Sequence, residues 1–195
     1  RFRAQQFRQA DAQPFGDFLH RGQGRVSLSA LQAADVGPVQ TAFVRHFLLG
    51  EALAFAEAGA RVAIASRTQA TGEEVVRLIR STGGEAIWIQ TDVAQASQVE
   101  AMVQAVIWAY GRLDVAFNNA GSGGAGGWLH EISEADWDLT VDGYLKSVYL
   151  CMKYEIAAML QSEEAGDHAG DHAIVNNSSV DGQRAFPFDP VYSAA

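Results

Sequence analysis

Apolar and polar positions alternate regularly along the chain after residue 51. Short apolar runs predict strands over residues 61–66, 86–90, 114–117 and 173–178. Stretches with apolar residues at helical spacing separate these runs. Strands that alternate with amphipathic helices form parallel sheets, so the pattern predicts an α/β fold.

The predicted helices carry local start signals. Two pairs have the spacing of capping boxes, Thr71 with Glu74 and Ser97 with Glu100. Ser133 precedes a long amphipathic stretch and is a candidate N-cap. These signals place a helix before and after each of the predicted strands 86–90 and 114–117.

The first fifty residues do not follow this pattern. Residues 1–24 mix Arg, Gln, Phe and Gly without a period, which predicts a poorly ordered extension. Residues 26–31 and 36–44 are candidate strands, and a helix is expected over 51–58. We therefore interpret residues 1–24 as an extension and residues 25–195 as one domain.

Composition narrows the class of protein. The chain of 195 residues has 48% hydrophobic residues and a net charge of −9, which predicts a soluble domain. The acidic balance argues against nucleic acid or an anionic membrane as partner. A single cysteine excludes a disulfide framework and favours a cytoplasmic location. No apolar run is long enough to span a bilayer.

Polar stretches follow several predicted strands, at the edge where parallel sheets bind ligands. They are Ser-Arg at 66–67, Asp-Val at 92–93, Asn-Asn-Ala-Gly at 118–121, Asn-Ser-Ser at 177–179 and, further on, Tyr-Ser-Ala-Ala at 192–195. Tyr192 stands thirteen residues after Ser179. In this order and spacing, the stretches resemble the classical short-chain dehydrogenase/reductase family over residues 51–195.

The resemblance implies a Rossmann-type fold, with a doubly wound parallel sheet in three αβα layers that lacks the family's last strands and helices. It implies a nicotinamide cofactor and hydride transfer between that cofactor and a small-molecule alcohol or carbonyl substrate. For a full-length relative it also implies a homo-oligomer.

The resemblance assigns three residues to catalysis. Tyr192 stands at the position of the family's acid/base and Ser179 at that of its hydrogen-bonding serine. The alternatives from the residues alone are a half-buried aromatic residue for Tyr192 and a turn residue for Ser179. Tyr144 stands where the family has an asparagine, and a phenol cannot present an amide carbonyl. The family's lysine would be residue 196, beyond Ala195.

Other residues are assigned to the cofactor by the same resemblance. Asn118, Ala120 and Gly121 would lie against the ribose on the adenine side, where glycine permits close approach. Asp92 with Val93 resembles the pair that contacts adenine. The alternative for Asp92 is a capping role in the turn before the next helix.

Residues 66–67 bear on the choice of cofactor. Ser66 occupies the position where an acidic residue would bind the ribose of NAD, and Arg67 follows it. This favours NADP, with NAD possible. The alternative for Arg67 is a solvated surface side chain.

The glycine-rich phosphate loop is missing from its expected place. Residues 121–126 match G-x-G-x-x-G, but they follow a later strand, so we interpret them as a loop near the substrate. The family's loop falls on residues 41–48, which contain no glycine. The alternative function is therefore a catalytically silent or truncated family member. His168 and His172 lie in a polar loop, where we expect no metal site.

Overall fold

The structure is a computed structural model that describes residues 27–29, 41–121, 126–164 and 172–195. The predicted extension over residues 1–24 lies outside the described residues, as do His168 and the middle of the G-x-G-x-x-G match.

Within the described residues, five parallel strands form one sheet in the order β3-β2-β1-β4-β5. Their bounds are β1 Ser27–Ser29, β2 Arg61–Ser66, β3 Glu85–Gln90, β4 Val115–Asn118 and β5 Ala173–Asn176. The chain passes outward from β1 to β3 and then returns to the other side of β1 with β4. This reversal is the mark of a doubly wound sheet, so the predicted α/β class is confirmed.

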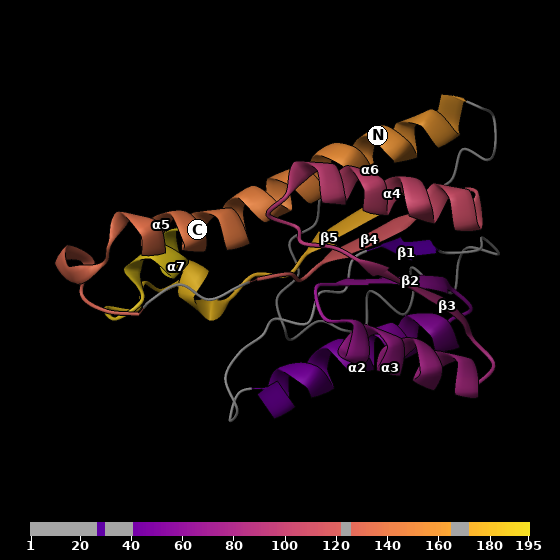
Figure 1. The fold of residues 1–195 in the computed structure, drawn as a ribbon, viewed down its shortest axis with the longest axis horizontal. Helices are drawn as coiled ribbons and strands as arrows, with labels where there is room; N and C mark the ends of the chain where they lie inside the picture. The colour runs from indigo at the N-terminus through magenta and orange to yellow at the C-terminus, as the bar shows by residue number, and fades with distance from the viewer. Residues whose placement is uncertain (1–26, 30–40, 122–125, 165–171) are drawn as a thin grey trace.

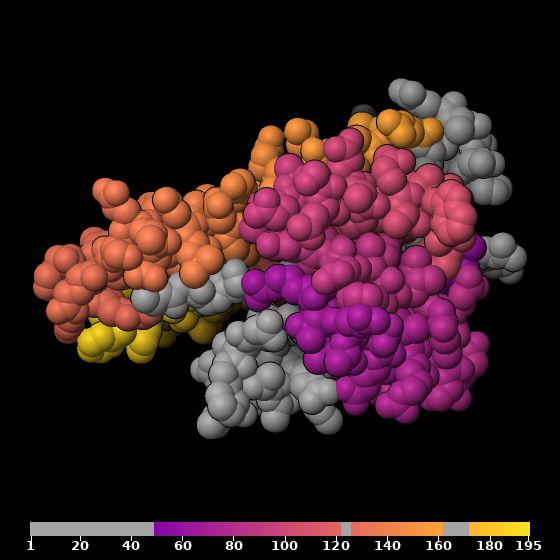
Figure 2. Space-filling model, in the orientation of Figure 1, coloured from indigo at the N-terminus to yellow at the C-terminus, as the bar shows by residue number. Residues whose placement is uncertain are grey.

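Helices lie on both faces of this sheet. Their bounds are α2 Thr41–Glu57, α3 Gln69–Ser81, α4 Ala96–Tyr110, α5 Glu134–Val141, α6 Ser147–Glu164 and α7 Pro190–Ala194. Shorter helical segments are η1 Leu129–Glu131, η2 Asp142–Lys146 and η3 Val180–Gly182. Helices α2 and α3 lie on one face, and α4 and α6 lie on the other (Figure 1). Helices α5 and α7 project together beyond one end of the sheet (Figure 2).

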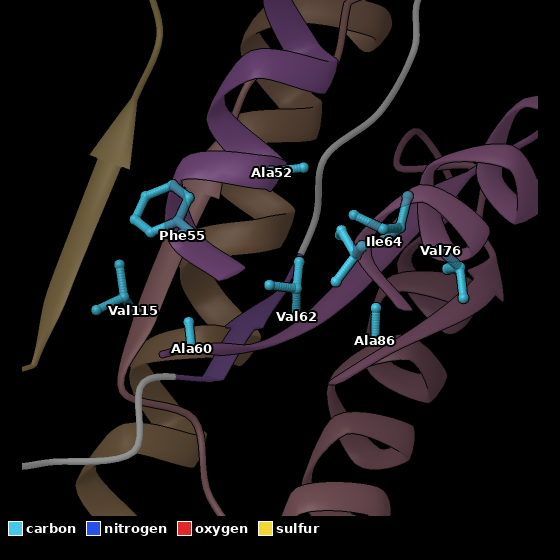
Figure 3. Close-up of a cluster of buried hydrophobic side chains, with 9 residues drawn as sticks. Ala52, Phe55, Ala60, Val62, Ile64, Val76, Ala86 and Val115 are labelled. Atoms are coloured by element: carbon cyan, nitrogen blue, oxygen red, sulfur yellow. The ribbon is translucent and has the colours of Figure 1, made fainter. Parts of the chain in front are cut away.

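Strand β2 shows why a central strand of the sheet has a continuous apolar run in the sequence. Val62 and Ile64 belong to the core beneath α2 and α3, where Phe55 also packs (Figure 3). Ala63 and Ala65, which alternate with them, belong to the cores on the opposite face. A strand covered by helices on both faces has no polar side, so β2 lacks the alternation of a half-exposed strand.

Two expectations near the start of the domain are changed by the structure. Strand β1 lies within the candidate 26–31 and pairs with both β2 and β4. Helix α2 begins at Thr41 rather than at residue 51. The candidate strand over 36–44 is therefore wrong for residues 41–44, since uninterrupted helical hydrogen bonding extends through them.

The predicted capping boxes are also wrong. Thr71 lies inside α3, where its Oγ1 donates to the Thr68 carbonyl at 3.0 Å. Helix α4 starts at Ala96, so Ser97 is already helical. By contrast, Ser133 caps α5 as expected, because its Oγ accepts from the Asp136 N–H at 3.1 Å.

Among the described residues, no helix combines the length and the apolar character needed to cross a membrane.

Candidate active site

The polar stretches identified in the sequence gather at one edge of the sheet because its described strands are all parallel. Ser66 ends β2 and Asn118 ends β4, and the other residues of the stretches at 66–67, 92–93, 118–121 and 177–179 follow β2, β3, β4 and β5. Across this edge, the Asn177 side-chain amide donates to the Asn119 side-chain carbonyl. The loops after β4 and β5 are thus tied together where the sheet ends.

Asn118 turns its side chain into the protein. It is 3% exposed, and its Nδ2 donates to Asn176 Oδ1 at 3.0 Å and to Glu155 Oε2 at 2.9 Å. The side chain therefore joins β4 to β5 and to α6. The cofactor contact expected of Asn118 stays a prediction.

Glu155 is a candidate site residue that no motif in the sequence indicated. Its side chain is completely buried on α6, in contact with the end of β4. Burial raises its pKa from 4.5 to about 7, and the hydrogen bond from Asn118 opposes that rise. Burial and the nearby Glu155 also raise the pKa of Cys151. The detectable signal was a glutamate between the apolar residues Cys151 and Ala158 on one helical face.

Ser66 and Arg67 differ in what they offer a ligand. Ser66 is buried, and its Oγ accepts from Trp88 Nε1 at 2.8 Å and donates to the Thr68 carbonyl at 3.2 Å. Arg67, the next residue, has an exposed side chain. Of the two, only Arg67 has a side chain that solvent reaches.

The Asp92 side chain forms a turn before α4 and does not cap that helix, whose N-cap residue is Gln95. Asp92 Oδ1 accepts from the Ala94 N–H at 3.1 Å, in the turn that leads to α4. Its own N–H donates to Gln98 Oε1 at 2.8 Å. Val93 is buried in the core beneath α4. The adenine contact of Asp92 and Val93 stays a prediction.

Ser179 and Tyr192 lie on neighbouring elements. Ser179 caps η3, and its Oγ accepts from the Asp181 N–H at 3.2 Å. Tyr192 lies on α7, which packs against both η3 and α5. Both residues are partly buried. The two candidates for catalysis therefore sit on one small structural unit beyond β5.

Tyr144 lies against Tyr192. Their ring centroids are 4.6 Å apart, with an angle of 62° between the ring planes. Burial, together with Tyr192 and Asp189, raises the pKa of Tyr144 to about 12. Burial and the nearby Asp181 raise the pKa of Asp189. Tyr144 is therefore a neutral phenol over the physiological pH range.

A nicotinamide nucleotide is the group that this fold implies, and the edge of the sheet fits its adenosine half. Exposed Arg67 follows β2, partly buried Asp92 follows β3, and Ala120 and Gly121 follow β4. A guanidinium, a carboxylate and small residues are suited to a ribose phosphate and a purine. Residues 41–48 are helical and contain no glycine, so we assign no residue to the pyrophosphate.

Known proteins resemble this chain in sequence and in fold. The family model for short chain dehydrogenase matches residues 49–195. The chain is 35% identical over 149 residues to a 3beta-hydroxysteroid dehydrogenase of Mediterraneibacter gnavus, an alignment that covers 75% of this chain and 51% of that protein. The chain thus spans about half the length of that relative.

Solved structures also resemble this chain in fold. A short-chain dehydrogenase/reductase of Burkholderia phymatum in complex with NAD has a TM-score of 0.70 and 29% identity, covering 88% of this chain and 54% of that one. A variant of actinorhodin polyketide ketoreductase with NADPH has a TM-score of 0.72 and 29% identity, covering 88% and 59%. The described fold is part of a Rossmann-type fold, and the chain belongs to the short-chain dehydrogenase family.

Proposed function

We propose that the protein is an NAD(P)-dependent oxidoreductase that transfers hydride between the nicotinamide and an alcohol or carbonyl substrate. The observation that carries the proposal is that Ser179 and Tyr192 lie on η3 and α7, two elements that pack against each other. We further propose a cytoplasmic location for the protein, and a homo-oligomer remains the expectation for full-length relatives.

Tyr192 is the acid/base in this proposal. A nicotinamide held at the edge of the sheet would supply hydride chemistry. In the reduction of a carbonyl, the Tyr192 phenol donates the proton to the substrate oxygen. Ser179 donates a hydrogen bond to the same oxygen. Its Oγ already accepts from the Asp181 N–H, so the hydroxyl hydrogen is left for donation.

The cofactor in this proposal is NADP, with NAD as the alternative. Arg67 is the supporting feature, because this exposed residue follows β2, where the ribose 2′-phosphate of NADP would lie. Ser66 supplies no negative charge that would repel this phosphate. The Ser66 side chain is buried, and its Oγ accepts a hydrogen bond from Trp88 Nε1.

A catalytically silent family member is the second candidate. The helical backbone over residues 41–48 favours it, because a glycine-rich turn there would let backbone N–H groups approach the pyrophosphate. A silent member would keep the fold and lack turnover.

Binding experiments test the cofactor assignment. Nicotinamide fluorescence is used to titrate the chain with NADPH and with NADH, and NADPH is expected to bind more tightly. Arg67→Gln should weaken NADPH binding about tenfold or more, the range of a charge-assisted hydrogen bond, and leave NADH binding unchanged. Arg77→Gln, an exposed arginine on α3, is the control. Equal losses for both nucleotides would contradict the role of Arg67.

Turnover experiments test the catalytic assignment. Oxidation of NADPH is followed with a panel of carbonyl compounds. Tyr192→Phe should lower kcat by about 100-fold or more while NADPH binding is retained, and Ser179→Ala should lower it less. Exposed Tyr149 on α6 supplies the matched control Tyr149→Phe. Cofactor binding without turnover of any compound would favour the silent family member.

A further inference from the structure

The helix that carries Tyr144 changes its winding at this residue. Between α5 and α6, the segment η2 is a π-helix, and Tyr144 is its central residue. Ser147 Oγ lies 2.8 Å from the Gly143 carbonyl and 3.2 Å from the Tyr144 carbonyl, and it donates to both. Lys146 Nζ forms an ion pair with Asp142 Oδ2 at 2.9 Å. Single π turns inside helices frequently occur at functional sites.

The Tyr144 ring occupies the space that a side chain at residue 121 would fill. A Cβ added to Gly121 would lie 2.8 Å from Cδ1 and 3.1 Å from Cζ of Tyr144, and closer still to Cε1. Real Cβ atoms essentially never approach within 3.0 Å of another heavy atom. The absence of a side chain at Gly121 therefore lets the ring lie against the backbone after β4.

The same ring contacts Tyr192 at an angle typical of an edge-to-face pair. Three segments that are distant in sequence thus meet at one ring: the loop after β4, the π-helix η2 and helix α7. Tyr192 also has α5 and η3 as neighbours of its helix. Within this unit, the Tyr144 ring contacts the Tyr192 ring directly.

We propose that Tyr144 is a positioning residue, whose ring is held against Gly121 and fixes the orientation of the Tyr192 ring. The part of this proposal that concerns catalysis rests on the proposed function of Tyr192. The packing of the ring orients Tyr192, and the Tyr144 hydroxyl is not needed for this. Tyr144→Phe should therefore preserve the orientation of the Tyr192 ring, and a non-aromatic residue at this position should not. Gly121 is needed because a methyl group there would displace the ring.

Magnetic resonance of the chain with isotope-labelled tyrosine tests the packing without any need for activity. The chain has five tyrosines, and the signals of Tyr192 are those lost in Tyr192→Phe. Tyr144→Leu should shift the Tyr192 ring signals, because the ring current of its neighbour is removed, and Tyr144→Phe should leave them nearly unchanged. Tyr149→Leu, at an exposed position on α6, is the control.

Gly121→Ala tests the same arrangement without changing either tyrosine. It should shift the Tyr192 signals, and in the double variant with Tyr144→Leu the added methyl should have no further effect, because no ring is left to displace. Unchanged Tyr192 signals in both Tyr144→Leu and Gly121→Ala would overturn the proposal. If Tyr144→Leu does not fold, Gly121→Ala and Tyr144→Phe still decide between the outcomes.

Kinetics then separate this proposal from the proposed function. Tyr144→Leu should lower kcat about tenfold to 100-fold, the cost of a misplaced catalytic group, with NADPH affinity unchanged and with near-normal kcat in Tyr144→Phe. A wild-type rate in Tyr144→Leu, with Tyr192→Phe inactive, would overturn the catalytic part of this proposal alone. An active Tyr192→Phe would instead contradict the proposed function, and the signal shifts would still test the packing.

Discussion

Replacing Glu155 with glutamine is expected to stabilise the protein above neutral pH and to have little effect in mild acid. The Glu155 side chain is fully buried, and its Oε2 accepts a hydrogen bond of 2.9 Å from Asn118 Nδ2. Burial raises its pKa from 4.5 to about 7. Glutamine has nearly the same shape, and its amide oxygen can accept the same hydrogen bond without carrying a charge.

The size of the effect follows from the two pKa values of Glu155. The carboxyl loses its proton near pH 4.5 in the unfolded chain and near pH 7 in the folded protein. Between these values the folded state binds one proton more, so the stability that Glu155 contributes falls as the pH rises. At about 1.4 kcal/mol for each pH unit, the loss approaches about 3 kcal/mol above the folded-state pKa. Below the unfolded-state pKa there is no loss.

Urea unfolding of the wild type and of Glu155→Gln at a series of pH values measures this effect. The free energy of unfolding of the variant, relative to the wild type, should increase with pH by up to about 3 kcal/mol and then level off. Other titrating groups are common to both proteins and cancel in the difference, except Cys151, whose raised pKa depends in part on Glu155 and lies well above the pH range of this test. Glu100→Gln, at an exposed position on α4, should give a difference that does not change with pH. A constant difference for Glu155→Gln as well would refute the reasoning.

Two further substitutions and one thiol reagent test the packing of the protein interior. Gly72→Ala should lower the free energy of unfolding by about 1–3 kcal/mol, measured with urea, since the new Cβ would overlap the Trp88 indole. Tyr110→Phe should lower it by about 1 kcal/mol, because the hydroxyl donates to the buried Val62 carbonyl at 3.2 Å. Cys151, which is 2% exposed with a raised pKa, should react with a thiol reagent only after urea unfolds the chain. Rapid reaction of the folded protein would contradict its burial.

Sequence patterns predicted the strands whose two faces are both buried. Strand β2 is an apolar run because helices cover both of its faces, and it was located to the residue. Strand β1 has three residues, Ser27–Ser29, of which only Leu28 is apolar. The candidate strand over 26–31 contains it, but so short a strand has no periodicity that would show its central place, which comes from pairing with β2 and β4. The start of α2 was missed because the family's loop was expected there.

The candidate site likewise includes residues that the sequence indicated and contacts that it did not. Ser179 and Tyr192 could be proposed from the resemblance to the family, which rests on motifs and spacing that the sequence displays directly. The burial of Glu155 against Asn118 and the contact of Tyr144 with Tyr192 join residues 37 and 48 positions apart. Such contacts depend on how α6 and η2 pack against other elements, which a linear pattern of apolar residues does not specify. Tyr144 was therefore identified by position, without its packing role.

Strand β1 has a further consequence for how the sheet holds together. It lies between β2 and β4, so its three residues are the hydrogen-bonded link between the β2–β3 half of the sheet and the β4–β5 half. The reversal of strand order that opens a ligand crevice in doubly wound sheets falls at the same place, between β1 and β4. A nucleotide bound across this crevice would contact both halves. Its binding free energy would then oppose their separation, so that cofactor affinity and the cohesion of the sheet would rise and fall together.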